Sequence, residues 1–234
     1  MSIKLPSQTI VVPQYSVWTR KWFDRYLGWN FKRHFQHIYC RGLSALHPVN
    51  GPLLLVANHV SWWDGFFLFE IQRRVRPQAK LFTVALEETY RKNSVLRKLG
   101  VLPLQPGSAA SVKTLLATLQ RLRFELPPQN LVVNFFPQGK ITPSFRSELN
   151  FQRGLEAVLA SLAPITVVPV GIHIEPMTGK LPTAILTLGA PLLCQDETPS
   201  VSKLESEVKN LLQEVHGLLE QNGEGLPAPF ESWH

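Results

Sequence analysis

Two residues of this chain, His59 and Asp64, have types and a spacing that suit acid–base chemistry. A neutral imidazole can take a proton from an alcohol near neutral pH, because its reference pKa is about 6.5. A carboxylate bonded to the other ring nitrogen would fix the tautomer and stabilise the imidazolium that forms. The pair could therefore activate a hydroxyl supplied by a substrate, without a Ser or Cys nucleophile. Taken alone, the same spacing is more typical of polar residues that cap the start of a helix.

A second candidate segment, residues 135–140, reads Phe-Phe-Pro-Gln-Gly-Lys. Gly139 permits close backbone approach and can turn an N–H towards a developing oxyanion or a phosphate. Lys140 and Arg146 could supply positive charge for a phosphate-bearing partner such as coenzyme A. By itself, the segment is more typical of a Pro-Gly turn with solvated cations.

Two further segments place small residues among apolar ones. Phe151 and Gly154 open a predicted helix, and Pro169 and Gly171 interrupt an apolar strand. Pro and Gly break the regularity of a strand, which indicates a bulge or close packing beside a site. Taken alone, each segment is better explained by core packing.

Both candidate sites directly follow predicted buried strands. The apolar run 53–57 ends at Asn58 and His59, and the run 131–136 leads into Pro137. Strands alternate with helices along the chain, which predicts an α/β fold with a mostly parallel central sheet flanked by helices. Such a sheet brings its loops to one edge, where a site can assemble. Further strands are expected at 80–85, 101–104, 165–174 and 183–188, and helices at 64–73, 87–99, 108–126, 155–162 and 201–219.

The segment from about residue 15 to 41 alternates aromatic and cationic residues. Trp18, Trp22, Tyr26 and Trp29 are spaced so that they share one face of a predicted amphipathic helix. Aromatic rings favour the boundary between lipid headgroups and acyl chains, and Lys and Arg attract anionic lipid. The helix could equally pack on the core, and the two placements are compatible if it has separate faces.

Composition limits the class of protein. The 234 residues, 44% hydrophobic and 18% charged, are typical of a folded protein with a substantial core. The net charge of +7 indicates a negatively charged partner: nucleic acid, an anionic membrane surface or a phosphorylated substrate. Cys40 and Cys194 are too few for a disulfide framework or a metal cluster, so we expect reduced thiols. Residues 1–16 lack the pattern of a secretory signal, and no apolar run is long enough to span a membrane.

Taken in order, these segments resemble the lysophosphatidate and glycerophosphate acyltransferase family over about residues 45–190. The family's His-(four residues)-Asp block matches at Asn58, His59 and Asp64. Its Phe-Pro-Glu-Gly block matches at Phe136, Pro137 and Gly139, with Gln138 in place of Glu. Its later Phe-x-x-Gly and Val-Pro-Val-Gly elements match at Phe151, Gly154, Val168, Pro169, Val170 and Gly171.

The resemblance implies an O-acyltransferase that moves a fatty acyl group from acyl-CoA or acyl-carrier protein to a lipid hydroxyl. His59 would be the general base and Asp64 would orient it. The residues expected to contact substrate are Phe136, Pro137, Gln138, Gly139, Lys140 and Arg146. The resemblance implies no cofactor, metal or nucleic acid, and it implies peripheral attachment to the cytoplasmic face of a membrane. The expected organisation is an amphipathic, membrane-facing arm at 1–45, an acyltransferase domain at 46–222 and a flexible tail at 223–234.

Departures from the family pattern bear on the acceptor. Pro106 stands where members that use glycerol phosphate carry an Arg, and Lys140-Ile141-Thr142 replaces Thr-Arg-Ser. Because a proline cannot bind phosphate by charge, the acceptor could instead be a neutral hydroxyl on a lipid or glycoside. Three different functions also fit the sequence: a non-catalytic lipid-binding protein on the same fold, a thioesterase that uses water, and a basic protein whose aromatic arm binds nucleic acid.

Overall fold

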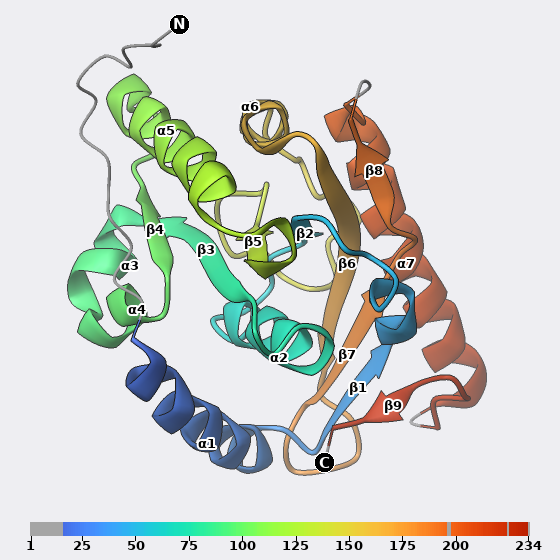
Figure 1. Ribbon diagram of the computed structural model, residues 1–234. Coiled ribbons are helices and arrows are strands. Elements are labelled where there is room, and N and C mark those ends of the chain that lie inside the picture. The colour runs from blue at the N-terminus through green and yellow to red at the C-terminus, as the bar shows by residue number, and fades with distance from the viewer. Residues whose placement is uncertain (1–15, 196–197, 224, 234) are drawn as a thin grey trace, which may run out of the picture.

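A mixed β-sheet forms the centre of the molecule, with nine strands in the residues that the structure describes (Figure 1). The computed structural model describes residues 16–195, 198–223 and 225–233. The strands are β1 (His37–Arg41), β2 (Leu53–Ala57), β3 (Lys80–Leu86), β4 (Val101–Leu104), β5 (Leu131–Phe135), β6 (Ile165–Glu175), β7 (Thr183–Leu188), β8 (Leu192–Cys194) and β9 (Glu231–Ser232).

The strand order is β4-β3-β5-β2-β6-β7-β1-β9, and β8 pairs with β6. The first five strands of this order run parallel to one another. Strand β1 is parallel to β7, whereas β7 and β8 are antiparallel to β6 and β9 is antiparallel to β1. The predicted mostly parallel sheet is therefore confirmed. Strands β2 and β5 are neighbours, so their carboxyl ends lie at the same edge of the sheet.

Helices cover both faces of the sheet, which buries the central strands on both sides. One core contains side chains of α1 and α2, and the other contains side chains of α5, α6 and α7. Successive β2 side chains alternate between the two cores, as expected for a strand. The helices are α1 (Val17–His34), α2 (Asp64–Val75), α3 (Glu87–Lys92), α4 (Ser94–Lys98), α5 (Ala109–Glu125), α6 (Gly154–Leu162) and α7 (Val201–Asn222), with two short 3-10 turns at η1 (Leu43–Leu46) and η2 (Pro128–Asn130).

Helix α1 has two separate faces. Its inner face is buried, and Phe23 packs edge-on against Phe69 of α2 at 5.3 Å between ring centroids. Arg20 also connects α1 to the segment between α2 and β3, because its guanidinium donates to the carbonyl oxygen of Ala79 at 2.7 Å. The outer face is exposed, so packing on the core leaves the aromatic stripe facing outwards. The buried side chains include Phe23, Leu27 and Phe31, and the exposed ones are Trp18, Trp22, Tyr26 and Trp29.

The structure differs from the predicted elements at one helix break and at three strands that were not predicted, β1, β8 and β9. The helix expected at 87–99 is broken at Asn93, whose backbone is extended (φ −121°, ψ 94°). The Asn93 side chain donates to the carbonyl of Thr89 at 3.0 Å, so it bonds the carbonyl that a continuing helix would have used. Strand β1 was not predicted, because it lies within the aromatic and cationic segment, although its buried and half-buried residues alternate.

The predicted division into arm, domain and tail stays a prediction. Residues 1–15 of the arm lie outside the described residues. At the arm's other end, residues 37–41 form β1 in the central sheet. Within the expected tail, Glu231 and Ser232 form β9, which pairs with β1.

Candidate active site

The turn at residues 58–64, here called the His59 turn, begins where β2 ends at the carboxyl edge of the sheet. Asn58 fixes its position, because its buried amide forms two hydrogen bonds with the backbone of Ile172 in β6. The side-chain Nδ2 donates to the Ile172 carbonyl at 2.8 Å, and the Ile172 N–H donates to Oδ1 at 2.7 Å. Clefts at the carboxyl ends of parallel strands are common ligand sites in α/β proteins.

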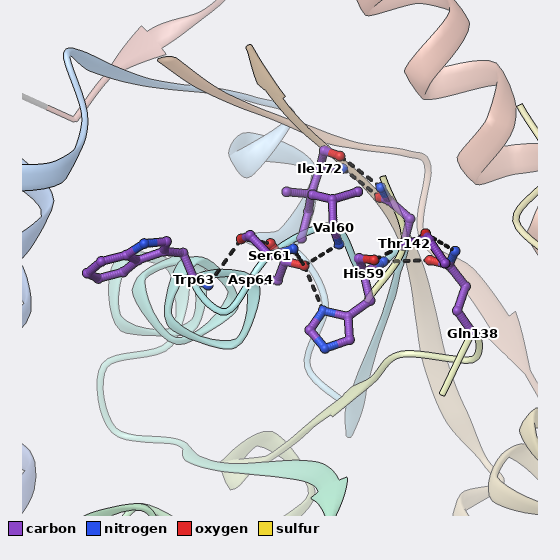
Figure 2. A network of polar contacts seen from close by, with 9 residues as sticks. His59, Val60, Ser61, Trp63, Asp64, Gln138, Thr142 and Ile172 are labelled. Atoms are coloured by element: carbon purple, nitrogen blue, oxygen red, sulfur yellow. Dashed lines mark hydrogen bonds and ion pairs between the residues drawn. The ribbon is translucent and has the colours of Figure 1, made fainter. Parts of the chain in front are cut away.

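The His59 and Asp64 side chains are in contact, with 2.7 Å between His59 Nδ1 and Asp64 Oδ2 (Figure 2). The Asp64 carboxylate is fully buried, whereas the imidazole is 23% exposed. The second ring nitrogen of His59 points away from Asp64 (Figure 2). The spacing in the sequence therefore brings together a buried carboxylate and a partly exposed imidazole whose second nitrogen is not bonded to that carboxylate, which is the arrangement that a general base needs.

Asp64 keeps its place through hydrogen bonds within the same turn. Its Oδ2 accepts the backbone N–H groups of Val60 (2.6 Å) and Ser61 (2.9 Å), and its Oδ1 accepts the Ser61 hydroxyl (2.6 Å). Ser61 Oγ in turn accepts the Trp63 N–H at 3.1 Å. These bonds offset the cost of burying the carboxylate. The sequence interpretation missed Ser61; a hydroxyl residue three positions before the aspartate was the available signal.

The segment at residues 136–142, here called the Gln138 loop, follows β5 and lies against the His59 turn. The Phe136 ring stacks on the imidazole of His59, with 4.4 Å between centroids and 23° between planes. Gln138 Oε1 accepts the backbone N–H of His59 at 2.6 Å, and the backbone N–H of Thr142 donates to the carbonyl of His59 at 2.9 Å. The loop therefore holds the ring and both backbone polar groups of His59.

Two residues of the Gln138 loop are placed differently from the expectation. Gln138 was expected to face a substrate hydroxyl, but its side chain is buried and both ends of its amide bond residues of the protein. Gly139 has the left-handed backbone conformation that favours glycine (φ 67°). Its N–H, which was expected to face an oxyanion or phosphate, donates to the Phe136 carbonyl at 3.0 Å.

Of the three remaining residues expected to contact substrate, Pro137 is buried, whereas Lys140 and Arg146 are exposed. The carbonyl of Pro137 accepts the N–H of Gln152 at 2.9 Å, which anchors the start of the Gln138 loop. Neither Lys140 nor Arg146 forms an ion pair within the described part of the chain. Both cations thus remain accessible to an anionic ligand.

The two apolar segments with Gly and Pro serve packing. Phe151 is buried, and its N–H donates to Glu205 of α7 at 3.1 Å. A Cβ on Gly171 would lie 2.8 Å from Thr187 Oγ1 and 3.1 Å from Leu211 Cβ, so glycine allows α7 to approach β6 closely. Strand β6 keeps an unbroken register with β2 through Pro169, without the bulge that the sequence suggested as one possibility.

A groove of about 340 Å³ lies beside the His59 turn, between α1 and α4. Trp62 and Trp63 of the turn form one part of its wall, and Trp22 and Tyr26 of α1 form another. Asn30 and residues 92–94 also line it. The aromatic face of α1 is therefore continuous with a groove that leads to the residues next to Asp64.

Neither a metal cluster nor a membrane-spanning helix is found among the described residues. Among them, no cluster of three or more His, Cys, Asp or Glu side chains has the arrangement of a metal site. None of the described helices has the length and apolar character required to cross a bilayer. Cys40 and Cys194 are both buried and free, and burial raises the pKa of the Cys40 thiol well above its usual range.

Fold and site together define an α/β protein that carries the groups needed for general-base chemistry at the carboxyl edge of its sheet. Its sequence matches the family described as Acyltransferase over residues 37–173, more than half of the chain, so the chain belongs to this acyltransferase family. This confirms the predicted family and enzyme class.

Comparison with solved structures gives the same fold. The crystal structure of the 1-acyl-sn-glycerophosphate (LPA) acyltransferase PlsC from Thermotoga maritima is similar, with a TM-score of 0.54 and 20% sequence identity. The similarity covers 88% of this chain and 82% of that chain. No curated protein matches the sequence significantly.

Proposed function

We propose that the protein transfers a fatty acyl group from acyl-CoA or acyl-carrier protein to the hydroxyl of a lipid. Membership of the acyltransferase family supports the group that is transferred. The fold shared with a 1-acyl-sn-glycerophosphate acyltransferase supports a lipid acceptor. The observation that carries the proposal is the 2.7 Å contact of His59 Nδ1 with buried Asp64, which leaves the other ring nitrogen available.

In the proposed reaction, Nε2 of His59 takes the proton of the acceptor hydroxyl as the hydroxyl oxygen attacks the thioester carbonyl carbon. The tetrahedral intermediate then collapses and the C–S bond breaks. The leaving thiolate takes the proton from the imidazolium, which restores the neutral base. Asp64 stabilises the imidazolium while it exists and holds Nδ1 in the productive tautomer.

Lys140 and Arg146 are the proposed contacts for phosphate on either the thioester carrier or the acceptor. Both are exposed near the end of the Gln138 loop, where their charges are free to meet an anion. Replacing both with Gln should raise the KM of one substrate. An increase for acyl-CoA alone assigns the cations to the donor, and an increase for a phosphorylated lysolipid alone assigns them to the acceptor.

Peripheral membrane binding through α1 is also part of the proposal. The three tryptophans of its outer face are 83%, 58% and 57% exposed at Trp18, Trp22 and Trp29. Cations accompany them: Lys21 lies over Trp18 at 5.8 Å and Arg33 over Trp29 at 5.3 Å. Indoles beside cations suit an anionic lipid surface, such as that of the cytoplasmic leaflet. The groove beside Trp62 and Trp63 is the proposed path of an apolar chain from that surface.

Acyl transfer itself is the first test. Purified protein is incubated with labelled acyl-CoA or acyl-carrier protein and two acceptors in vesicles, a lysophosphatidate and a neutral monoacylglycerol. We expect labelled lipid product, and we expect His59→Ala to lower kcat/KM on the order of 10³-fold or more. His47→Gln, at an exposed histidine, is the matched control and should keep full activity.

The outcomes distinguish acyl transfer from hydrolysis and from simple lipid binding. Full activity of His59→Ala would remove the proposed mechanism. Release of free fatty acid without acylated lipid would identify a thioesterase. Vesicle binding without any thioester consumption, over a broad panel of acceptors, would identify a lipid-binding protein that lacks this activity.

Membrane binding has a separate test. Trp18→Ala combined with Trp29→Ala should weaken binding to vesicles that contain anionic lipid and leave thermal unfolding unchanged. Phe124→Ala, at an exposed aromatic residue of α5, is the control and should leave vesicle binding unchanged. Equal binding by the double variant and the wild type would remove α1 as the membrane contact.

A further inference from the structure

The backbone of His59 belongs to a closed ring of three hydrogen bonds (Figure 2). Its N–H donates to Gln138 Oε1 at 2.6 Å. Gln138 Nε2 donates to Thr142 Oγ1 at 2.7 Å, and Thr142 Oγ1 donates to the carbonyl of His59 at 3.3 Å. Gln138 and Thr142 are 5% and 7% exposed, so the ring is closed off from solvent.

The directions of the three bonds in this ring match the donor and acceptor ends of an amide at position 138. A backbone N–H can only donate, so the atom of residue 138 that faces His59 must be an acceptor. The atom that faces Thr142 must then donate, because the threonine hydroxyl uses its one proton for the His59 carbonyl. A glutamine has one acceptor end and one donor end. A glutamate has only acceptor oxygens, so the hydroxyl of Thr142 would have to turn away from His59 to donate to it.

Charge also distinguishes the two residues. Gln138 is neutral and buried, and it bonds the backbone N–H of the residue whose ring is already paired with Asp64. A glutamate at this position would place a second carboxylate against the backbone N–H of His59, the residue that carries the imidazole. A nearby negative charge stabilises the imidazolium form, because opposite charges attract more strongly where water is excluded. The base would then hold its proton up to a higher pH.

We propose that Gln138 and Thr142 are positioning residues that fix the backbone of His59 through an uncharged ring of hydrogen bonds, which leaves the charge on the imidazole to be set by its contact with Asp64. This inference rests on the proposed role of His59 as the base. It assigns to Thr142 a part in the reaction, and it assigns to Gln138 support of the base in place of contact with the acceptor.

The charge of position 138 is tested by NMR titration of the His59 ring. The signals of this ring are assigned by their absence from the spectrum of His59→Gln. In Gln138→Glu, the protonation midpoint should move upwards relative to the wild type, because the added negative charge favours the imidazolium. The acid limb of the kcat/KM profile should move by the same amount. Gln129→Glu adds the same charge at the opposite, amino end of β5, where Gln129 is exposed, and should move neither.

The hydroxyl of position 142 is tested by two variants. Thr142→Val keeps the shape but removes the hydroxyl, and we expect kcat to fall about tenfold with little change in the KM of the donor. Thr142→Ser restores the hydroxyl and should recover most of the lost kcat. Equal activity of the Val and Ser variants would overturn the role of Thr142. An unchanged titration midpoint in folded Gln138→Glu would overturn the charge argument.

The NMR measurement does not depend on turnover, which separates this inference from the proposed function. If no acyl transfer is found but the midpoint moves in Gln138→Glu, the ring stands and the proposed reaction fails. If acyl transfer depends on His59 but neither the midpoint nor the Thr142 variants respond, the reaction stands and the ring fails. Should Gln138→Glu not fold, which circular dichroism shows directly, the Thr142 pair decides the outcome.

Discussion

The His59 turn and the Gln138 loop lie against each other but are held in different ways. Within the His59 turn, Asp64 bonds residues no more than five positions away. The Gln138 loop instead bonds His59, which is 79 residues away for Gln138 and 83 for Thr142. The bonds of Asp64 are local, whereas the bonds of the Gln138 loop to His59 exist only when β2 is paired with β5, and those of Asn58 to Ile172 only when β2 is paired with β6. Substitutions within the local arrangement should change chemistry, and substitutions at the long-range contacts should change stability as well.

Asp64→Asn gives the largest expected effect. The amide keeps an oxygen that can accept the local N–H groups, but it carries no charge to stabilise the imidazolium. We therefore expect kcat to fall on the order of 10³-fold or more, with the protein still folded. Steady-state kinetics and circular dichroism check the two parts. Glu125→Gln, at an exposed carboxylate, serves as the control. If Asp64→Asn lost its fold together with its activity, this would contradict the distinction between the two regions.

Asn58→Asp tests the long-range attachment of the His59 turn. A carboxylate would face the carbonyl oxygen of Ile172, which now accepts a hydrogen bond from the Asn58 amide. Both bonds are buried, so we expect the free energy of unfolding to fall by about 2–4 kcal/mol. Urea denaturation measures the loss. Asn210→Asp, at an exposed position of α7, should cost far less, and equal losses for the two variants would argue against the role of the Asn58 amide.

Gly139 tests the conformation of the Gln138 loop. A Cβ at this position would meet no atom within 4 Å, so any cost comes from the left-handed backbone (φ 67°). Gly139→Val should lower the free energy of unfolding by about 1–2 kcal/mol. Gly139→Asn should lower it less, because Asn tolerates this conformation. Thermal and urea unfolding compare the two variants. Similar losses of unfolding free energy in both would show that the cost of substituting Gly139 does not come from its backbone conformation.

His173 gives the smallest expected effect, through pH. Burial lowers the pKa of His173 and the nearby His216 of α7 lowers it further, while Glu175 of β6 raises it in part. Between the lowered pKa and the ordinary value of about 6.5, the unfolded chain binds a proton that the folded chain does not. The contribution of His173 to the free energy of unfolding should therefore be complete above about pH 6.5. It should decline as the pH falls below that value, by at most about 1.4 kcal/mol per pH unit.

Two substitutions check this dependence. His173→Gln should flatten the decline in unfolding free energy as the pH falls below about 6.5. His47→Gln, at an exposed histidine, should leave the slope unchanged. A slope that is the same in His173→Gln and in the wild type would show that other groups cause it.

The elements that the sequence predicted well are those with strong local signals. Helix α5 begins after Ser108, whose side chain accepts the N–H of Ser111 at 3.2 Å, and it ends just before Pro127. The contact of His59 with Asp64 was predictable for the same reason, because both residues belong to one short turn. Periodicity, capping residues and prolines act over a few positions, so they can be read from the sequence alone.

The contacts that the sequence did not predict join distant positions or depend on a single side chain. The Asn58 amide meets Ile172, 114 residues away, only because β2 and β6 are neighbours. The amide of Gln138 turns inwards because the backbone N–H of His59, in the turn after another strand, donates to it. The break at Asn93 depends on one side chain competing with the helix for a carbonyl.

Trp63 is covalently next to Asp64 and packs against the end of α1. Its ring centroid lies 6.0 Å from that of Phe31, 4.8 Å from His34 and 5.6 Å from Phe35. If α1 binds lipid as proposed, a shift of this helix on the membrane would be passed through these ring contacts to the residue next to Asp64. We therefore expect the turnover rate to depend on the composition of the vesicle even when substrate is saturating.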